Sequence, residues 1–126
     1  MSGQPLAILL LSGTHERAHY AFALAAGAAA LGRPALIFAT NGGCRALAAD
    51  WSGLGDAGRD AALQARGLAG LETLREACQE LGITLLACAA GLQMEALPAA
   101  SLLPGVRVSG IAEFLAESAG AQTLSL

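Results

Sequence analysis

The chain has 126 residues, enough for one domain with its own core, and we expect a single domain over residues 1–126. Its net charge is −3 and its seven basic residues are scattered arginines, which argues against a nucleic-acid partner. Only 13% of the residues are charged and 55% are apolar, so we expect part of the apolar surface to be buried in an oligomer.

The first half of the chain predicts two buried strands separated by a long helix. The apolar run 5–11 is bounded by turn residues, as in a strand covered on both faces. A helix capped by Thr14 follows and runs to about residue 31, where a glycine ends it. The run 34–39 predicts the second buried strand, and a glycine turn then leads into a short helix over 44–49.

The second half continues this alternation after an irregular, glycine-rich segment. Residues 50–67 predict a long loop or lid with a helical turn near 61–66. The later elements are a helix, a strand, a short helix, a strand, a helix and a strand, over 68–81, 83–87, 89–96, 106–108, 111–118 and 121–125. This order predicts a three-layer α/β/α fold, Rossmann-like or flavodoxin-like, with a mainly parallel five-stranded sheet.

The sequence predicts no targeting segment and no membrane partner. The apolar run 5–11 lacks a basic region before it and an A-x-A cleavage site, which favours a strand over a signal peptide. The apolar stretch 20–31 is too short to cross a bilayer. We therefore expect a cytoplasmic protein whose three cysteines are not a disulfide framework.

Residues with reactive side chains follow the first three predicted strands. Cys88 begins a helix, where backbone N–H groups lower the pKa of a thiol and favour the thiolate. Cys44 lies beside Arg45 after the second strand, and His15 opens the helix after the first. Ligands of open α/β sheets bind outside the carboxyl ends of the strands, where the strand order reverses, so we expect these residues at that edge.

Burial is the alternative for Cys44 and Cys88, because free cysteine is often a core residue. Cys78 lies on the apolar stripe of its predicted amphipathic helix, and we assign it to packing.

The segment 15–19 spells H-E-x-x-H, in which two histidines on one helix face can share a metal ion. A zinc protease is disfavoured, because catalytic zinc needs three protein ligands and the chain has only these two histidines. Three interpretations remain open: His15 and His19 bind a metal ion together with Cys88, they activate its thiol, or they are ordinary surface or interface residues. No other cofactor is predicted.

In its order and spacing of segments, the chain resembles the DsrE/DsrF-like family, which includes the TusD-type sulfur-relay proteins. The similarity runs through the opening strand and loop at 9–13, the segment 30–40, the approach to the cysteine at 81–88, and the segment 104–111 before 113–115.

The resemblance implies a Rossmann-like fold and a homotrimer or homohexamer. It matches Cys88 to the cysteine on which some members carry sulfur as a persulfide, taken from a donor protein and passed to an acceptor. It implies a sulfur carrier or sulfurtransferase-like protein. To this we add the hypothesis that Cys44 resolves or assists and that His15 or Arg45 supplies positive charge. The alternatives are a structural oligomer, or a non-catalytic small-molecule or metal-binding module that uses His15, His19 and the strand-end loops.

Overall fold

The computed structural model describes residues 3–126 and contains one parallel sheet of five strands in the order β4-β3-β2-β1-β5. The strands are β1 Leu6–Leu10, β2 Ala35–Ala39, β3 Thr84–Cys88, β4 Arg107–Ser109 and β5 Gln122–Ser125. Every strand pair is parallel, so the predicted three-layer α/β class is confirmed.

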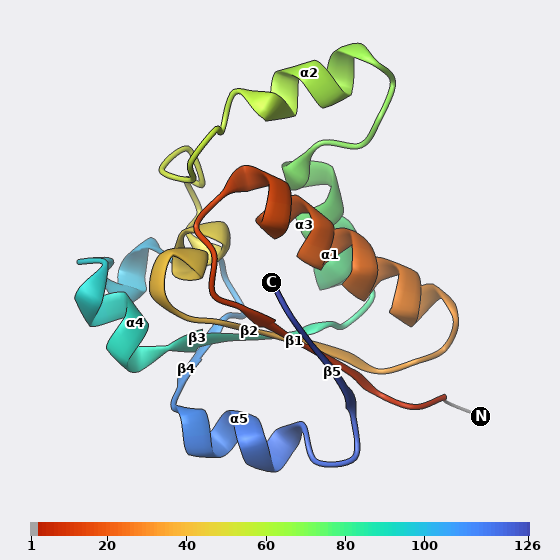
Figure 1. Cartoon of the computed structure of the whole chain (residues 1–126), viewed down its shortest axis with the longest axis vertical. Helices are drawn as coiled ribbons and strands as arrows, with labels where there is room; N and C mark the ends of the chain where they lie inside the picture. Colours follow the sequence, from red (N-terminus) through yellow and green to blue (C-terminus); the bar gives the residue numbers. More distant parts are fainter. Residues whose placement is uncertain (1–2) are drawn as a thin grey trace.

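Helices cover the two faces of the sheet unequally (Figure 1). The helices are α1 His15–Ala30, α2 Arg59–Ala65, α3 Leu71–Glu80, α4 Ala89–Met94 and α5 Ile111–Glu117, with 3-10 helices η1 Asn41–Leu47 and η2 Ala99–Ser101. Figure 1 shows α1 and α3 on one side of the sheet and α5 alone on the other.

The direction of the strand crossovers explains this asymmetry. From β1 to β4 the chain moves across the sheet in one direction, so right-handed crossovers all lie on one face. The connection from β4 to β5 returns in the opposite direction, and the same handedness therefore brings α5 to the other face.

The core is divided by the sheet in the same unequal way. The larger cluster lies between the sheet and α1 and α3, where small residues such as Ala21 and Ala25 let α1 approach closely around Phe22. The smaller cluster lies under α5 and consists of Ala7, Leu36, Phe38, Leu86, Cys88 and Phe114. All five residues of the central strand β2 are buried, as its continuous apolar run predicts.

Most of the predicted elements are confirmed with small shifts of their ends. The helix expected over 44–49 is η1, a 3-10 helix over Asn41–Leu47 whose first residue has a left-handed φ of 49°. The helix expected over 68–81 begins only at Leu71, and η2 had no counterpart in the sequence analysis. Over residues 3–126, no helix is both long and apolar enough to cross a membrane.

Candidate functional site

The loops that follow β1, β2 and β3 meet at the carboxyl edge of the sheet, as expected for parallel strands. Gly13 and Gly42 touch, and a Cβ on Gly13 would lie 3.0 Å from the Cα of Gly42. On α4, a Cβ on Gly91 would lie 2.7 Å from the backbone nitrogen of Asn41 and 3.0 Å from the sulfur of Cys44. Glycine allows these close approaches, which lock the three loops together.

The prediction that the reactive residues lie where the strand order reverses is wrong for Cys88. The order β4-β3-β2-β1-β5 reverses between β1 and β5. Cys88 ends β3, which is separated from β1 by β2, so the thiol does not lie at the reversal point. The reversal depends on where β5 pairs, and no residue pattern in the chain reports that pairing.

Cys88 has the backbone position that the sequence predicts. It is the last residue of β3 and the N-cap residue of α4. Its side chain is only 3% exposed and packs in the small cluster beneath α5 with Phe38 and Phe114. The thiol is therefore covered by apolar side chains rather than open at the edge of the sheet.

Cys44 lies on the other side of the sheet and is fully buried. Its thiol donates a 3.5 Å hydrogen bond to the carbonyl oxygen of Ala39. Burial, reinforced by the nearby Cys88 and Glu95, raises the pKa of Cys44 to about 11, although the backbone of Cys88 lowers it in part. Cys44 is thus a neutral thiol at neutral pH.

Arg45, which the sequence analysis offers as a source of positive charge, forms an ion pair with Glu95. Its guanidinium pairs with the Glu95 carboxylate, with Nε 3.2 Å from Oε1, and also donates to the Glu95 carbonyl oxygen. This pair joins η1 to the C-terminal end of α4.

Cys78 is a packing residue, as its position on the helix stripe predicts. It is fully buried, and its thiol lies 3.4 Å from the carbonyl oxygen of Phe22 as a hydrogen-bond donor. Burial raises the pKa of Cys78 to about 11.

His15 is fully buried and lies against the segment that follows η1. Its Nε2 is 2.7 Å from Oδ1 of Asp60, and its ring centroid is 5.8 Å from that of Trp51. The ring stacks on His19, which bonds through Nε2 to the carbonyl oxygen of Ala69. Among the hydrogen bonds of residues 3–126, none joins either imidazole to a cysteine.

The two histidines do not form the core of a metal site. Both Nε2 atoms already face protein oxygen atoms. In the described part of the chain, no three His, Cys, Asp or Glu side chains are grouped so as to hold a metal ion. Catalytic zinc needs three protein ligands, so the residues present do not fit it.

Asp60 is a central residue that the sequence analysis missed. Its carboxylate faces His15 and accepts 2.7 Å hydrogen bonds from the backbone N–H of Leu71 and from the side chain of Gln64. Burial raises the pKa of Asp60, but these hydrogen bonds outweigh burial and hold the pKa below its usual value. Asp60 thereby joins α1, α2 and the start of α3, and it orders the segment expected to be a loop.

Arg75 is the second missed residue. Its guanidinium is fully buried and pairs at 2.9 Å with Glu72, which also accepts a 3.1 Å hydrogen bond from Trp51. The remaining hydrogen bonds, at 2.6–3.0 Å, go to the carbonyl oxygens of Ala46, Ala48 and Ala49. Arg75 therefore fixes the chain that leaves η1. The sequence carries one signal for Arg75: it is a charged residue on the buried face of an amphipathic helix, where charged residues are rarely found without a partner.

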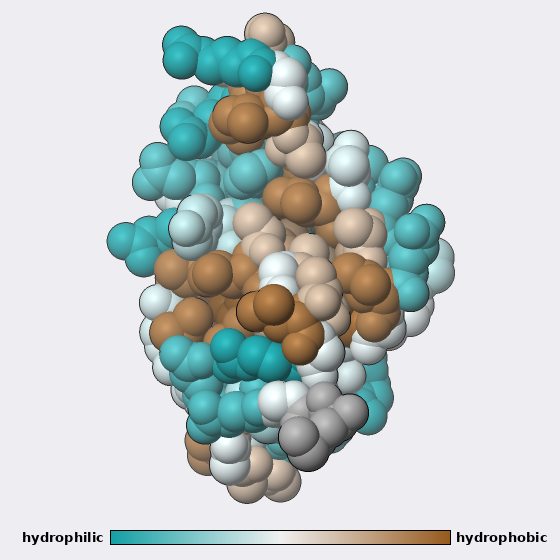
Figure 2. Space-filling view, turned by 90° about the vertical axis from the view of Figure 1, so that its right-hand side faces the viewer, coloured by the Kyte–Doolittle hydropathy of each residue, from teal (hydrophilic) through white to brown (hydrophobic). Residues whose placement is uncertain are grey.

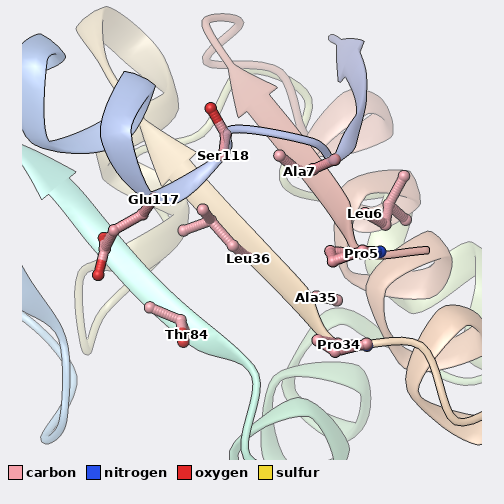
Figure 3. Close-up of a pocket in the computed structure, with 10 residues that line it drawn as sticks. Pro5, Leu6, Ala7, Pro34, Ala35, Leu36, Thr84, Glu117 and Ser118 are labelled. Carbon is pink, nitrogen blue, oxygen red and sulfur yellow. The ribbon is translucent and has the colours of Figure 1, made fainter. Parts of the chain in front are cut away.

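A pocket of about 260 Å³ lies on the α5 face at the opposite, amino-terminal edge of the sheet (Figure 3). Leu36 lies in the middle of its floor, with Thr84 on one side and Ser118 above. None of the candidate residues lines this pocket, so we assign it no part in the chemistry.

The class defined by this geometry is an all-parallel α/β protein with a cysteine at the junction of its third strand and the following helix. Over 64 residues, 51% of the chain, the sequence is 34% identical to the sulfur carrier protein DsrE2 of Allochromatium vinosum. The matched segment is 40% of that relative's length. No family model matches the chain.

Two solved structures share the fold over 98% of the chain and all of their own length. The crystal structure of the ychN protein from E. coli has a TM-score of 0.68 at 14% identity. The protein of unknown function MTH1491 from Methanobacterium thermoautotrophicum has a TM-score of 0.66 at 16% identity. The sequence match to DsrE2 agrees with the resemblance to the DsrE/DsrF-like family, and the two solved structures share the fold.

Proposed function

We propose that this chain is a cytoplasmic sulfur carrier that holds sulfane sulfur as a persulfide on Cys88. The Cys88 thiolate attacks the outer sulfur of a donor persulfide, so a new S–S bond forms and the donor leaves as a thiolate. An acceptor thiolate then attacks the outer sulfur on Cys88, and Cys88 leaves as a thiolate. Sulfur is transferred without a net oxidant or reductant.

The observation that carries this proposal is the contrast between the three cysteines. Cys44 and Cys78 each donate to a main-chain carbonyl and have pKa values of about 11. Such thiols are neutral and unreactive at neutral pH, because the thiolate is the nucleophile. Cys88 alone among the three combines a strand end with the start of a helix. The match to a sulfur carrier supports the same reading.

Exchange at Cys88 requires α5 to move away from the sheet, because the thiol is 3% exposed. α5 has seven residues, and Phe114 is its one buried side chain, stacked on Phe38 with ring centroids 4.7 Å apart. Arg107 adds ion pairs to Glu113 and Glu117, but these are exposed and contribute little. Local opening of such a short element costs less than global unfolding.

The experiment compares loading of the wild type with the Cys44→Ser, Cys78→Ser and Cys88→Ser variants, using thiosulfate or polysulfide as donor. We expect reductant-reversible sulfur on the first three proteins and none on Cys88→Ser. Discharge onto a small acceptor thiol should follow the same pattern. Loading that survives in Cys88→Ser would overturn the proposal.

We also propose that the partner on one apolar face is a second copy of the chain, in a closed homo-oligomer such as a trimer or hexamer. Figure 2 shows apolar side chains gathered across the side where α1 ends and β5 runs. A groove of about 350 Å³ lies there, with Leu24, Leu31 and Leu124 among its residues. Leu31 is 77% exposed, and patches of this kind mark protein interfaces.

Light scattering tests this interface. The Leu31→Glu variant should dissociate the oligomer, whereas Leu115→Glu, at an exposed leucine of α5, should not. A monomeric wild type would contradict the proposed assembly without bearing on Cys88.

A further inference from the structure

Ser109 lies beside Cys88 on the same face of the sheet. It is the last residue of β4, and its Cα pairs with that of Cys88 in the parallel register of β3 and β4. Residues paired in this way project their side chains to the same face. Both side chains are nearly buried, at 6% exposure for Ser109 and 3% for Cys88.

The hydroxyl of Ser109 has no hydrogen-bond partner among the described residues. His15 and Arg75 also have one orphaned nitrogen each, but both bond through their other polar atoms. A buried hydroxyl without a partner costs free energy, and such groups are rare enough to need a reason. Ser109 therefore has an unused donor at the position next to the proposed sulfur-carrying thiol.

We propose that this hydroxyl is the hydrogen-bond donor for the outer sulfur of a persulfide on Cys88, an inference that rests on the proposed function. No hydrogen bond joins Ser109 to the Cys88 thiol in the unloaded chain. A second sulfur extends the side chain by an S–S bond of about 2.05 Å, which lengthens its reach from the Cys88 position. The donor then serves the loaded state and not the empty one.

The surroundings make this donor effective. The outer sulfur of a persulfide carries the negative charge, and beneath α5 it would lie among Phe38, Leu86 and Phe114. A buried anion without a donor is strongly disfavoured, whereas a hydrogen bond to a charged group in an apolar site is among the stronger ones. Ser109 gives up no proton. It only donates a hydrogen bond, so the sulfur is still transferred by the two thiolate attacks of the proposed function.

The test measures the equilibrium between glutathione persulfide and Cys88 in the wild type and three variants. Ser109→Ala should lower the loading equilibrium constant about tenfold or more, because a hydrogen bond to a charged group is lost. Ser109→Thr keeps a hydroxyl and should load like the wild type. Ser118→Ala is the control, because it removes a serine hydroxyl at the far end of α5, beside the pocket at the other edge of the sheet, and should change nothing.

A second readout separates sulfur binding from a structural role. The alkylation rate of unloaded Cys88 should be the same in Ser109→Ala and the wild type, whereas general loosening of α5 would raise it. Equal loading of Ser109→Ala and the wild type would overturn the role of Ser109 and leave the carrier function intact. A wild type that takes up no sulfur would overturn the carrier function itself, and with it this role.

Discussion

His15 and Asp60, 45 residues apart in the chain, meet in the interior with Nε2 2.7 Å from Oδ1. The same carboxylate oxygen accepts the backbone N–H of Leu71 at the start of α3. One carboxylate thus joins the helix after β1 to the segment between η1 and α3. A region that is rich in glycine and charge is ordered by this buried polar contact together with the packing of Leu54 and Trp51 on the core.

Replacing Asp60 should weaken this connection. We expect Asp60→Asn to lower the free energy of unfolding by about 1–3 kcal/mol, because buried hydrogen-bond donors around the carboxylate lose their acceptor. Denaturant unfolding measures the change. Asp56→Asn, at an exposed position of the same segment, is the control and should have a small effect. Equal effects of the two substitutions would show that the contact with His15 contributes little.

Arg75 should be equally sensitive. Arg75→Met keeps an unbranched apolar side chain but leaves the carbonyl oxygens of Ala46, Ala48 and Ala49 without their donor. We expect a loss of about 3 kcal/mol in the free energy of unfolding. Arg66→Met, at an exposed arginine, provides the comparison by thermal and denaturant unfolding. A stable Arg75→Met protein would mean that other groups fix the chain after η1.

Alkaline pH should destabilise the protein through Cys44 and Cys78. Burial raises both pKa values from 9.0 to about 11, so the unfolded chain loses these protons at lower pH than the folded chain. The stabilisation from each neutral thiol is fully present below about pH 9 and is lost between about pH 9 and about pH 11. In that range the free energy of unfolding falls by on the order of 1 kcal/mol per pH unit for each thiol. The measurement is the free energy of unfolding against pH. Cys78→Ala should reduce the slope, and an unchanged slope would contradict the assignment.

Two glycines in helices should respond to alanine with opposite signs. Gly91→Ala places a Cβ 2.7 Å from the backbone nitrogen of Asn41, so α4 must separate from η1 and stability should fall. In the Leu31→Glu background, which separates the proposed oligomer, Gly27→Ala meets nothing within 4 Å and should stabilise α1 by about 1 kcal/mol or less. Thermal unfolding compares the two variants. Tolerance of Gly91→Ala would show that the packing of α4 on η1 is loose.

The sequence predicts the elements of this fold because its first three strands are mainly apolar runs and glycines end most of its helices. It cannot predict the face on which Cys88 lies, because a strand buried on both faces has no alternating pattern. The pairing of Cys88 with Ser109 depends on the strand order, which follows only from the three-dimensional structure. Asp60 and Arg75 were missed for a related reason. Their partners are distant main-chain groups or a residue 45 positions away.

The measurement that tests the central claim most directly is peptide mass spectrometry of the wild-type protein after incubation with a sulfane-sulfur donor, in the absence of reductant. We expect one added sulfur, removed by reductant, on the peptide that contains Cys88, and no addition at Cys44 or Cys78. No addition, or equal addition at all three cysteines, would contradict the assignment of Cys88 as a sulfur carrier.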